Sequence, residues 1–572
     1  MDMCRALAYR LFQSKIALWM IGLLLPLQAN AQSDLDARLK RVVHNSPIKL
    51  DNVTWCFLDG DGDNLSEHNA EFGMKPASTM KLLTTAAAFE LLPENFQTKL
   101  WVSGTNETVL RWVGVGDPMI GDPGPREDNL VPSTLLAQLV KQIRIAGVTK
   151  VTRLEYDAHY FSGPRYHPNW PEEQFSKSYR CESAALNFAG NLVHVELQPR
   201  RSRPKLAYFP SEASQLITVR EQFTDLQTTT KKDAVGFDRF RGRNEFRAFG
   251  VCRNRHTLKS PVHDPARWSA ELLAAALRKS GIPVLQVSAA NPDKPIPQER
   301  PILGATITTP LNRVIQYCNT TSRNLYAECL LKSVDRELGG TGSWLASGDD
   351  QKTAGQRMRD ELSSLFADVI SPADVIDDGS GLSHNNRLTA RTLARLLDRA
   401  QSRPWHANWL QSLALARETG TLSNRFRSGV FDDCTIRGKS GYIRGASTLA
   451  GRLERDDDQH LSFAIMVKDM RSSSDAKRLH ESLIAELIKY IPRRSEGDES
   501  PEFDRNQMQE PKLESVSQAP SSAPESDHGT NVGQKNLHPG GSQSFRTNQA
   551  IVSRSFAMVI GTLFIVAGIR YR

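Results

Sequence analysis

Ser78 and Lys81 are the first pair of residues whose types and spacing could do chemistry. They lie in Lys75-Pro76-Ala77-Ser78-Thr79-Met80-Lys81, where Pro76 and the Ala-rich run after Lys81 indicate the start of a helix. A spacing of three places both side chains on one helix face. A serine becomes a nucleophile when a base takes its proton, and an amine is such a base if burial or a second cation lowers its pKa. Taken alone, the pair is a weak signal, and the alternative is an ordinary N-capping serine.

Two later motifs strengthen the catalytic interpretation. Ser322-Arg323-Asn324 precedes a segment with apolar residues at helical spacing, and Lys439-Ser440-Gly441-Tyr442 precedes two strand-like runs. The order SxxK, SxN and a KTG-like triplet is the constellation of penicillin-recognising serine acyl enzymes.

Further segments make the resemblance specific. They are Gly114-Val115-Gly116-Asp117-Pro118, residues 156–170, residues 183–197, residues 262–284 and Asp378-Gly379-Ser380-Gly381-Leu382-Ser383. With these, most of residues 48–490 resembles the D-Ala-D-Ala carboxypeptidase/endopeptidase family, peptidase family S13, of low-molecular-mass penicillin-binding proteins. More than two hundred residues separate Ser78 from Ser322, a large insertion typical of that family.

The resemblance implies a role for each motif. Ser78 attacks the carbonyl between two D-alanines, with Lys81 as the base, kept neutral by partial burial and by Lys439. Ser322 relays a proton to the leaving amine, and Asn324 binds Lys81 and the substrate amide. A base formed by Ser322 with Lys439 stays open as an alternative.

The third motif is expected to bind substrate. Lys439 and Ser440 would hold the terminal carboxylate, and Gly441 belongs to the same substrate-binding motif. The N–H groups of Ser78 and Tyr442 would form the oxyanion hole. The family usually has Thr or Ser at the position of Tyr442, so we expect altered beta-lactam affinity with catalysis retained.

Asp157 is a further predicted substrate contact. It ends a strand-like run from residue 148, and in the resembling family an aspartate at this point binds the amine on the third residue of the stem peptide. The alternative is an aspartate that only caps a turn.

The expected fold class is α/β, a transpeptidase/beta-lactamase-like domain with an antiparallel sheet flanked by helices. The resemblance makes this domain discontinuous, over residues 32–98 and 298–492, with beta-rich accessory domains inserted at 99–297. Alternation predicts a half-buried strand at Val53, Trp55 and Phe57, and further strands over residues 205–255, 447–453 and 461–467. An apolar stripe predicts a closing helix, Ala476 to Ile491. A disulfide between Cys181 and Cys252, both in the insert, is left open.

The chain ends predict export. Residues 1–31 have a basic start, an apolar run and Ala29-Asn30-Ala31, which is typical of a secretory signal peptide. Residues 493–550 are polar and predict a disordered linker. The apolar segment within 551–572 predicts a C-terminal membrane anchor, or a tail at the membrane interface. We therefore expect a protein on the periplasmic or cell-wall side.

Composition and missing motifs limit the other function classes. Lys+Arg 72 against Asp+Glu 64 gives +8 over 572 residues, too little to predict nucleic-acid binding. The acidic run Asp59 to Asn64 departs from an EF-hand loop, so a hairpin turn is expected there, and we expect no metal or cofactor. Expected partners are peptidoglycan stem peptides and, as covalent inhibitors, beta-lactams. The alternatives are a serine beta-lactamase or esterase, a catalytically silent wall-binding module and a Ser-His-Asp hydrolase. The absence of a GxSxG motif argues against the last of these, and His384 is interpreted as a surface or packing residue.

Overall fold

The computed structural model describes residues 33–103, 108–122, 132–227, 232–293, 300–302, 305–456 and 459–491. The predicted signal peptide 1–31, the linker 493–550 and the anchor 551–572 lie outside these ranges. Among the helices within them, we find none whose length and apolar character would let it cross a bilayer.

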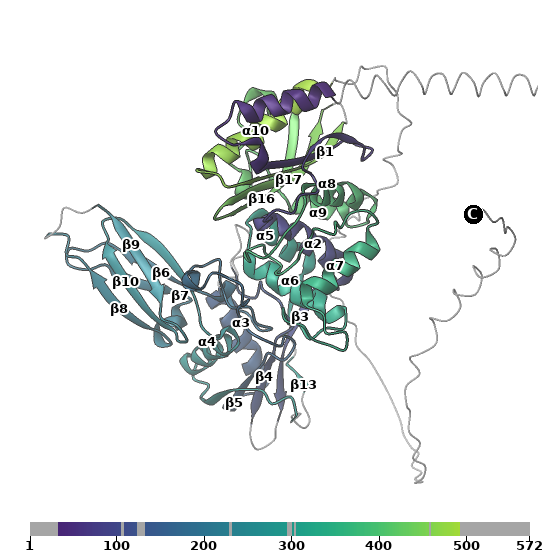
Figure 1. The fold of residues 1–572 in the computed structure, drawn as a ribbon. Helices are drawn as coiled ribbons and strands as arrows, with labels where there is room; N and C mark the ends of the chain where they lie inside the picture. Colours follow the sequence, from purple (N-terminus) through teal and green to yellow (C-terminus); the bar gives the residue numbers. More distant parts are fainter. Residues whose placement is uncertain are drawn as a thin grey trace, which may run out of the picture. The chain divides into compact units, whose positions relative to one another are not determined.

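A six-stranded antiparallel sheet forms one part of the molecule (Figure 1). Its order is β15 (Ala414–Leu415), β16 (Cys434–Ile443), β17 (Ala446–Arg455), β18 (His460–Lys468), β1 (Val53–Leu58) and β2 (Asn64–His68). The strands predicted at 447–453 and 461–467 are confirmed as β17 and β18, and the acidic run joins β1 to β2 as a hairpin turn. The sheet therefore unites the N-terminal and C-terminal portions of the described chain.

Helices cover both faces of this sheet. On one face, α10 (Ser473–Tyr490) and the helix over residues 33–44 pack on a core that includes Trp55 and Leu449. On the other face lies α8 (Ala390–Arg399). The predicted closing helix is confirmed as α10, with Leu479, Leu483 and Leu487 buried.

β1 differs from its prediction because all six of its residues are buried. Val53, Trp55 and Phe57 pack in the core beneath α10, whereas Cys56 and Leu58 belong to the core on the α8 side. The alternation of apolar and polar residues indicated one buried face. It failed because Thr54 and Cys56 are small enough to be buried beneath α8.

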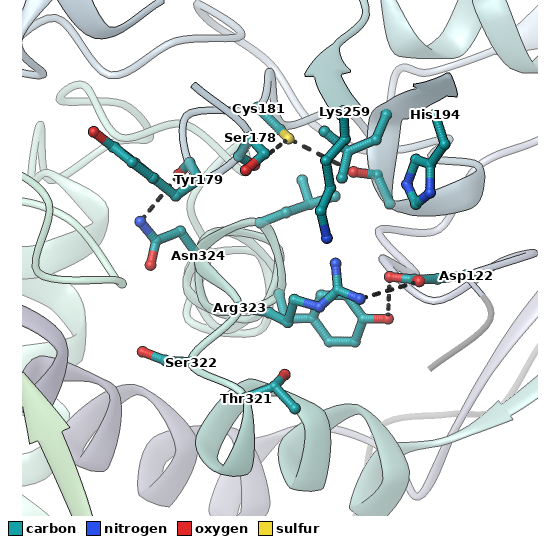
Figure 2. Close-up of a pocket in the computed structure, with 14 residues that line it drawn as sticks. Asp122, Ser178, Tyr179, Cys181, His194, Lys259, Thr321, Ser322, Arg323 and Asn324 are labelled. Atoms are coloured by element: carbon teal, nitrogen blue, oxygen red, sulfur yellow. Dashed lines mark hydrogen bonds and ion pairs between the residues drawn. The ribbon is translucent and has the colours of Figure 1, made fainter. Parts of the chain in front are cut away.

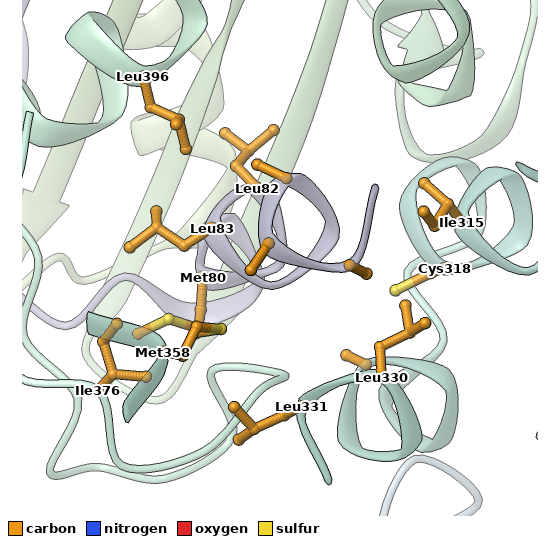
Figure 3. Packing of buried hydrophobic residues seen from close by; sticks show 14 of the residues in the cluster. Met80, Leu82, Leu83, Ile315, Cys318, Leu330, Leu331, Met358, Ile376 and Leu396 are labelled. Carbon is orange, nitrogen blue, oxygen red and sulfur yellow. The ribbon is translucent and has the colours of Figure 1, made fainter. Parts of the chain in front are cut away.

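α2 (Met80–Leu91) is the centre of the helical layer (Figure 3). Its residues from Met80 to Ala88 are all buried, the mark of a helix enclosed on every side. The helices packed around it are α5 (Leu311–Thr320), α6 (Asn324–Glu337), α7 (Ala354–Leu365), α8 and α9 (His406–Ser412). The first turn of α2, which carries Lys81, is thereby held firmly in the core.

Residues 95–310 build three further sheets. The largest has the order β12 (Val284–Ala289), β5 (Val151–Asp157), β4 (Val109–Val113), β3 (Asn95–Ser103) and β13 (Arg300–Pro301), with β14 (Ile307–Pro310) also paired to β3 and with helices α3 (Pro132–Ile145) and α4 (Pro265–Lys279). The two three-stranded sheets have the orders β8 (Thr218–Phe223), β10 (Glu245–Val251), β9 (Ala234–Arg239) and β11 (His256–Pro261), β6 (Leu192–Gln198), β7 (Lys205–Phe209). Strands over residues 205–255 are thus confirmed. β3 runs through residues 98 and 99, between which the insert was predicted to begin, so no break in the secondary structure marks that boundary. The domain boundaries stay a prediction.

The bridge between Cys181 and Cys252 is not formed. Both are buried free thiols, and each donates to a separate backbone carbonyl: Cys181 Sγ to Ser178 O at 3.1 Å, Cys252 Sγ to Asn254 O at 3.3 Å. The remaining cysteines that the structure describes, Cys56, Cys318, Cys329 and Cys434, are also free and buried. Cysteine count alone could not separate paired from packed thiols.

Candidate active site

Ser78 lies in a 3₁₀ turn, Ala77–Thr79, that leads directly into α2. The backbone of Ala77 is left-handed, with φ +47°, a conformation that costs about 1–3 kcal/mol in a residue other than glycine. Gly381 packs against this residue so closely that a Cβ there would lie 1.7 Å from Ala77 O. The strained turn is therefore held in place by a neighbour that must lack a side chain.

Lys81 directs its amine at Ser78. Its Nζ lies 3.0 Å from Ser78 Oγ, and the side chain is fully buried. Burial lowers the pKa of Lys81 to about 8, which makes a neutral amine accessible near neutral pH. The expected partial burial is thus corrected to complete burial, and Lys439 is not among the causes of the shift.

The two other partners of Lys81 fix the direction of its lone pair. The amine donates to Asn324 Oδ1 and to the carbonyl of Ser380, each at 2.8 Å. Because Asn324 Nδ2 donates to Tyr179 O at 3.0 Å, its Oδ1 is the atom that faces Lys81. The protonated amine donates its third N–H to Ser78 Oγ at 3.0 Å; once the amine is neutral, Asn324 and Ser380 occupy its two N–H groups and the lone pair is left for the Ser78 hydroxyl.

Lys439 forms a second lysine–serine pair. Its Nζ donates to Ser322 Oγ at 2.9 Å and to Ser440 O at 3.0 Å. Burial, followed by repulsion from Lys81, holds the pKa of Lys439 well below its usual value. The second-cation effect expected at Lys81 therefore acts on Lys439. The backbone of Ser322 is left-handed, with φ +59°, so one strained residue, Ala77, precedes the first motif and another, Ser322, begins the second.

β16 brings the third motif beside the nucleophile. At Gly441 an added Cβ would lie 2.9 Å from Ser78 N and 2.2 Å from Thr448 Oγ1, so only glycine permits this approach. Thr448 Oγ1 donates to Pro76 O at 2.7 Å and ties β17 to the turn before Ser78. Tyr442, by contrast, is 60% exposed.

Thr421 and Glu328 belong to the site and were not predicted from the sequence as functional. Thr421 Oγ1 accepts a hydrogen bond from Ser440 Oγ at 2.8 Å. The buried carboxylate of Glu328 accepts from Gly379 N at 3.1 Å and Ser380 N at 2.8 Å. Burial, followed by repulsion from Asp378, raises the pKa of Glu328 to about 8. An acidic residue one turn after Asn324, among apolar neighbours, was the available signal for Glu328.

A cavity of about 460 Å³ opens over Ser78. Its lining includes residues of all three motifs together with Gln174, Tyr179, Leu382 and His384. His384, interpreted from the sequence as a surface or packing residue, lies in the cavity wall with Nδ1 3.4 Å from the Lys75 amine. Burial, followed by the nearby Lys75, lowers the pKa of this histidine.

Asp157 is not among the residues that line this cavity. Its carboxylate accepts from the backbone N–H of His159 at 3.1 Å and lies 2.8 Å from His159 Nδ1. These contacts are those of a turn cap at the end of β5. Its role in reading the substrate amine stays a prediction.

Comparison with known proteins identifies the family of this chain. The sequence profile described as the D-Ala-D-Ala carboxypeptidase 3 (S13) family matches residues 39–489. A D-alanyl-D-alanine carboxypeptidase from an Actinomadura species is 27% identical over 464 residues, with 77% of this chain and 81% of that protein covered. The D-alanyl-D-alanine carboxypeptidase DacB of Haemophilus influenzae is 22% identical over 449 residues, with 74% of this chain and 88% of that protein covered.

Solved structures agree on the fold. The crystal structure of penicillin binding protein 4 (dacB) from Haemophilus influenzae matches with a TM-score of 0.62 at 18% sequence identity, covering 79% of this chain and 99% of that chain. The expected fold class is thereby confirmed, as is the resemblance found in the sequence. Since the profile spans most of the 572 residues, this chain belongs to the D-Ala-D-Ala carboxypeptidase 3 (S13) family of serine-type peptidases.

Proposed function

We propose that the protein is an exported D-Ala-D-Ala carboxypeptidase and DD-endopeptidase that cleaves peptidoglycan stem peptides through an acyl-enzyme on Ser78. The observation that carries the proposal is the hydrogen bond between Lys81 and Ser78, because it unites a nucleophile with a base whose pKa lies near neutrality. Family membership and the names of the relatives support the same substrate class.

In the first step, Ser78 Oγ attacks the carbonyl carbon of the penultimate D-alanine while its proton passes to Lys81. The lone pair of Lys81 points at that hydroxyl because Asn324 and Ser380 occupy its N–H groups. The alternative base, Ser322 with Lys439, is less well supported, since it is Lys81 that contacts Ser78, whereas Lys439 contacts Ser322.

In the second step, the tetrahedral intermediate expels the terminal D-alanine. Ser322 would deliver the proton to the leaving amine, replenished from Lys439 at 2.9 Å. The N–H groups of Ser78 and Tyr442 would stabilise the oxyanion, a contribution of about 2.7–4 kcal/mol for one donor in other acyl-transfer enzymes. Water then attacks the ester carbonyl and gives its proton through Ser322 to Lys439, and protonated Lys81 returns its proton to Ser78 Oγ as the ester bond breaks.

The terminal carboxylate would be held by Lys439 and Ser440. Ser440 in place of threonine keeps a hydroxyl, and its bond to Thr421 brings a second hydroxyl to the same place. Tyr442 offers an exposed ring where the family usually has a small hydroxyl. We therefore expect beta-lactams to acylate the enzyme with altered affinity; one of the solved relatives is penicillin binding protein 4 complexed with a beta-lactam.

Labelling with a fluorescent penicillin tests the proposal. Wild-type protein should carry the label on Ser78, identified by mass spectrometry, and Ser78→Ala should carry none while keeping its thermal unfolding transition. Label that persists in Ser78→Ala would disprove the mechanism. Rapid release of the label with drug turnover would favour a beta-lactamase, and a wild-type protein without label would favour a silent wall-binding module.

Export is the second part of the proposal, and residues 1–31 and 551–572 carry it. The signal-processed protein should fractionate with membranes and resist a high-salt wash, whereas deletion of 550–572 should release it to the soluble exported fraction. Extraction of the wild-type protein by salt would indicate a peripheral, charge-held association instead.

A further inference from the structure

A second cavity, of about 520 Å³, adjoins the one that holds Ser78. The two cavities share Tyr179, Ser322 and Asn324 in their lining. The far wall of the second cavity comes from the sheet of β11, β6 and β7, which contributes Lys259 and His194 (Figure 2). A substrate bound over Ser78 can therefore extend across the Ser322–Asn324 segment into a second space.

Two cations, Lys259 and Arg323, face each other in this cavity. Lys259 and His194 are direct neighbours across β11 and β6, and Figure 2 shows the ammonium of Lys259 directed toward the guanidinium of Arg323. Within the described ranges the side chain of Lys259 makes neither an ion pair nor a hydrogen bond. Like charges at close range repel unless an anion lies between them, so this arrangement has room and charge for one.

The net charge of the cavity indicates what kind of anion. Arg323 is paired with Asp122, whose carboxylate lies 3.3 Å from Arg323 and accepts from Tyr326 at 3.0 Å. Burial, followed by repulsion from Lys259, lowers the pKa of His194 to about 4, so that this ring is neutral at pH 7. One positive charge remains unbalanced, which matches a carboxylate better than a doubly charged phosphate.

We propose that this cavity is a subsite for a carboxylate of the peptide substrate other than the one at its scissile end, held between Lys259 and Arg323. Charge-assisted hydrogen bonds of this kind are about twice as strong as neutral ones. The inference rests on the proposed peptidase function and adds a charge that the substrate must carry upstream of the cleaved bond.

Two matched peptides test the subsite with the full-length protein. Both end in D-Ala-D-Ala and contain an upstream glutamate residue, whose carboxylate is free in one peptide and amidated in the other. Lys259→Met removes the cation, Lys259→Arg keeps it, and Lys205→Met removes an exposed lysine from β7, in the same sheet, that does not line the cavity.

The wild-type kcat/KM should be about tenfold higher for the acid than for the amide, the effect of one charge-assisted contact. Lys259→Met should abolish this preference by slowing the acid peptide alone, whereas Lys259→Arg and Lys205→Met should retain it. Equal rates for the two peptides in the wild type, or equal losses for both in Lys259→Met, would overturn the subsite.

Penicillin labelling separates this inference from the proposed function. Lys259→Met should label on Ser78 as fast as the wild type. If neither peptide is cleaved and Ser78 takes no label, the peptidase proposal fails, and calorimetric binding of the two peptides to Ser78→Ala then decides about the cavity. Tighter binding of the acid, lost when Lys259→Met is added, supports the subsite; equal binding refutes it.

Discussion

Two fully buried lysines on neighbouring helices have the same lowered pKa and different surroundings. Lys81 in α2 and Lys332 in α6 are 0% and 1% exposed, and burial brings the pKa of each to about 8. Lys81 contacts Ser78, Asn324 and Ser380. Lys332 donates to Pro164 O at 3.3 Å and lies 3.8 Å from the ring centre of Trp344.

The comparison separates basicity from catalysis. Burial alone produces a lysine that can be neutral near pH 8, and it does so twice in this protein. At Lys81, acceptors occupy the N–H groups and the lone pair meets a hydroxyl, whereas at Lys332 the contacts are a carbonyl and an aromatic ring. A perturbed pKa therefore marks a catalytic residue only together with the geometry of its partners.

The largest expected effect is that of Lys81→Met. Removing the base should slow penicillin acylation of Ser78 by roughly 10³-fold, within the range typical of general-base catalysis. The matched control is Lys332→Met, which should acylate at the wild-type rate. Stopped-flow measurement of the acylation rate in both variants tests this prediction. Comparable slowing in the two would mean that contact with Ser78 is not what makes Lys81 the base.

The pH profile of acylation should give the next largest effect. Since the neutral form of Lys81 is the base, the acylation rate should rise with pH and level off above about 8. At pH 6 it should be about a hundredfold below the plateau, a factor of ten per pH unit. Lys332→Met should leave this midpoint in place, and a midpoint that moves with Lys332 would contradict the assignment.

Glu328→Gln should disturb the catalytic lysine from a distance. Around and above pH 8, where Glu328 is ionised, its carboxylate raises the pKa of Lys81, so its loss should move the midpoint of the acylation profile to lower pH. An amide offers one oxygen to the N–H groups of Gly379, Ser380 and Trp344, so unfolding should become easier by about 1–3 kcal/mol. An unchanged midpoint with reduced stability would limit Glu328 to a structural role.

Lys332→Met should make the protein more stable. The folded-state pKa of Lys332 is below the unfolded value of 10.5, so the buried charge costs stability in full below pH 8. That cost declines as the pH rises from about 8 to 10.5. The variant should gain about 1–3 kcal/mol at pH 7 and less at pH 10, as measured by urea unfolding. A loss of stability would show that the contact with Trp344 outweighs burial.

The smallest effect is expected for Asp157→Asn. The resemblance implies that its carboxylate reads the substrate amine, so the variant should lower kcat/KM by about tenfold for peptides with a free amine and leave their acetylated analogues nearly unchanged. Equal effects on the two peptides would instead limit Asp157 to its turn contact with His159, which an amide oxygen can keep.

The sequence predicted the parts of the site that are local and the parts that the family resemblance implies. Ser78 and Lys81 share a helix turn, so their contact follows from spacing, and the meeting of Ser322 with Lys439 follows from the family pattern. The strands and the closing helix could be predicted because their apolar periods are regular.

Long-range burial could not be predicted in this way. Nothing in the spacing shows that Lys81 is enclosed completely, that Glu328 lies beneath Ser380, or that His384 faces the cavity. The same holds for β1, whose second buried face depends on α8, more than three hundred residues later in the chain. Such facts depend on which elements pack together, and a single sequence records that only weakly.

The free thiols have a practical consequence for labelling the enzyme. All six cysteines that the structure describes are buried, and burial raises the pKa of Cys56, Cys181, Cys318 and Cys329 to about 12. Thiols of this kind react slowly with maleimides, because the thiolate is the reactive form. A cysteine introduced at the exposed Tyr442 should therefore take a fluorophore selectively in the native protein, giving an optical reporter of substrate entry without removal of the natural cysteines.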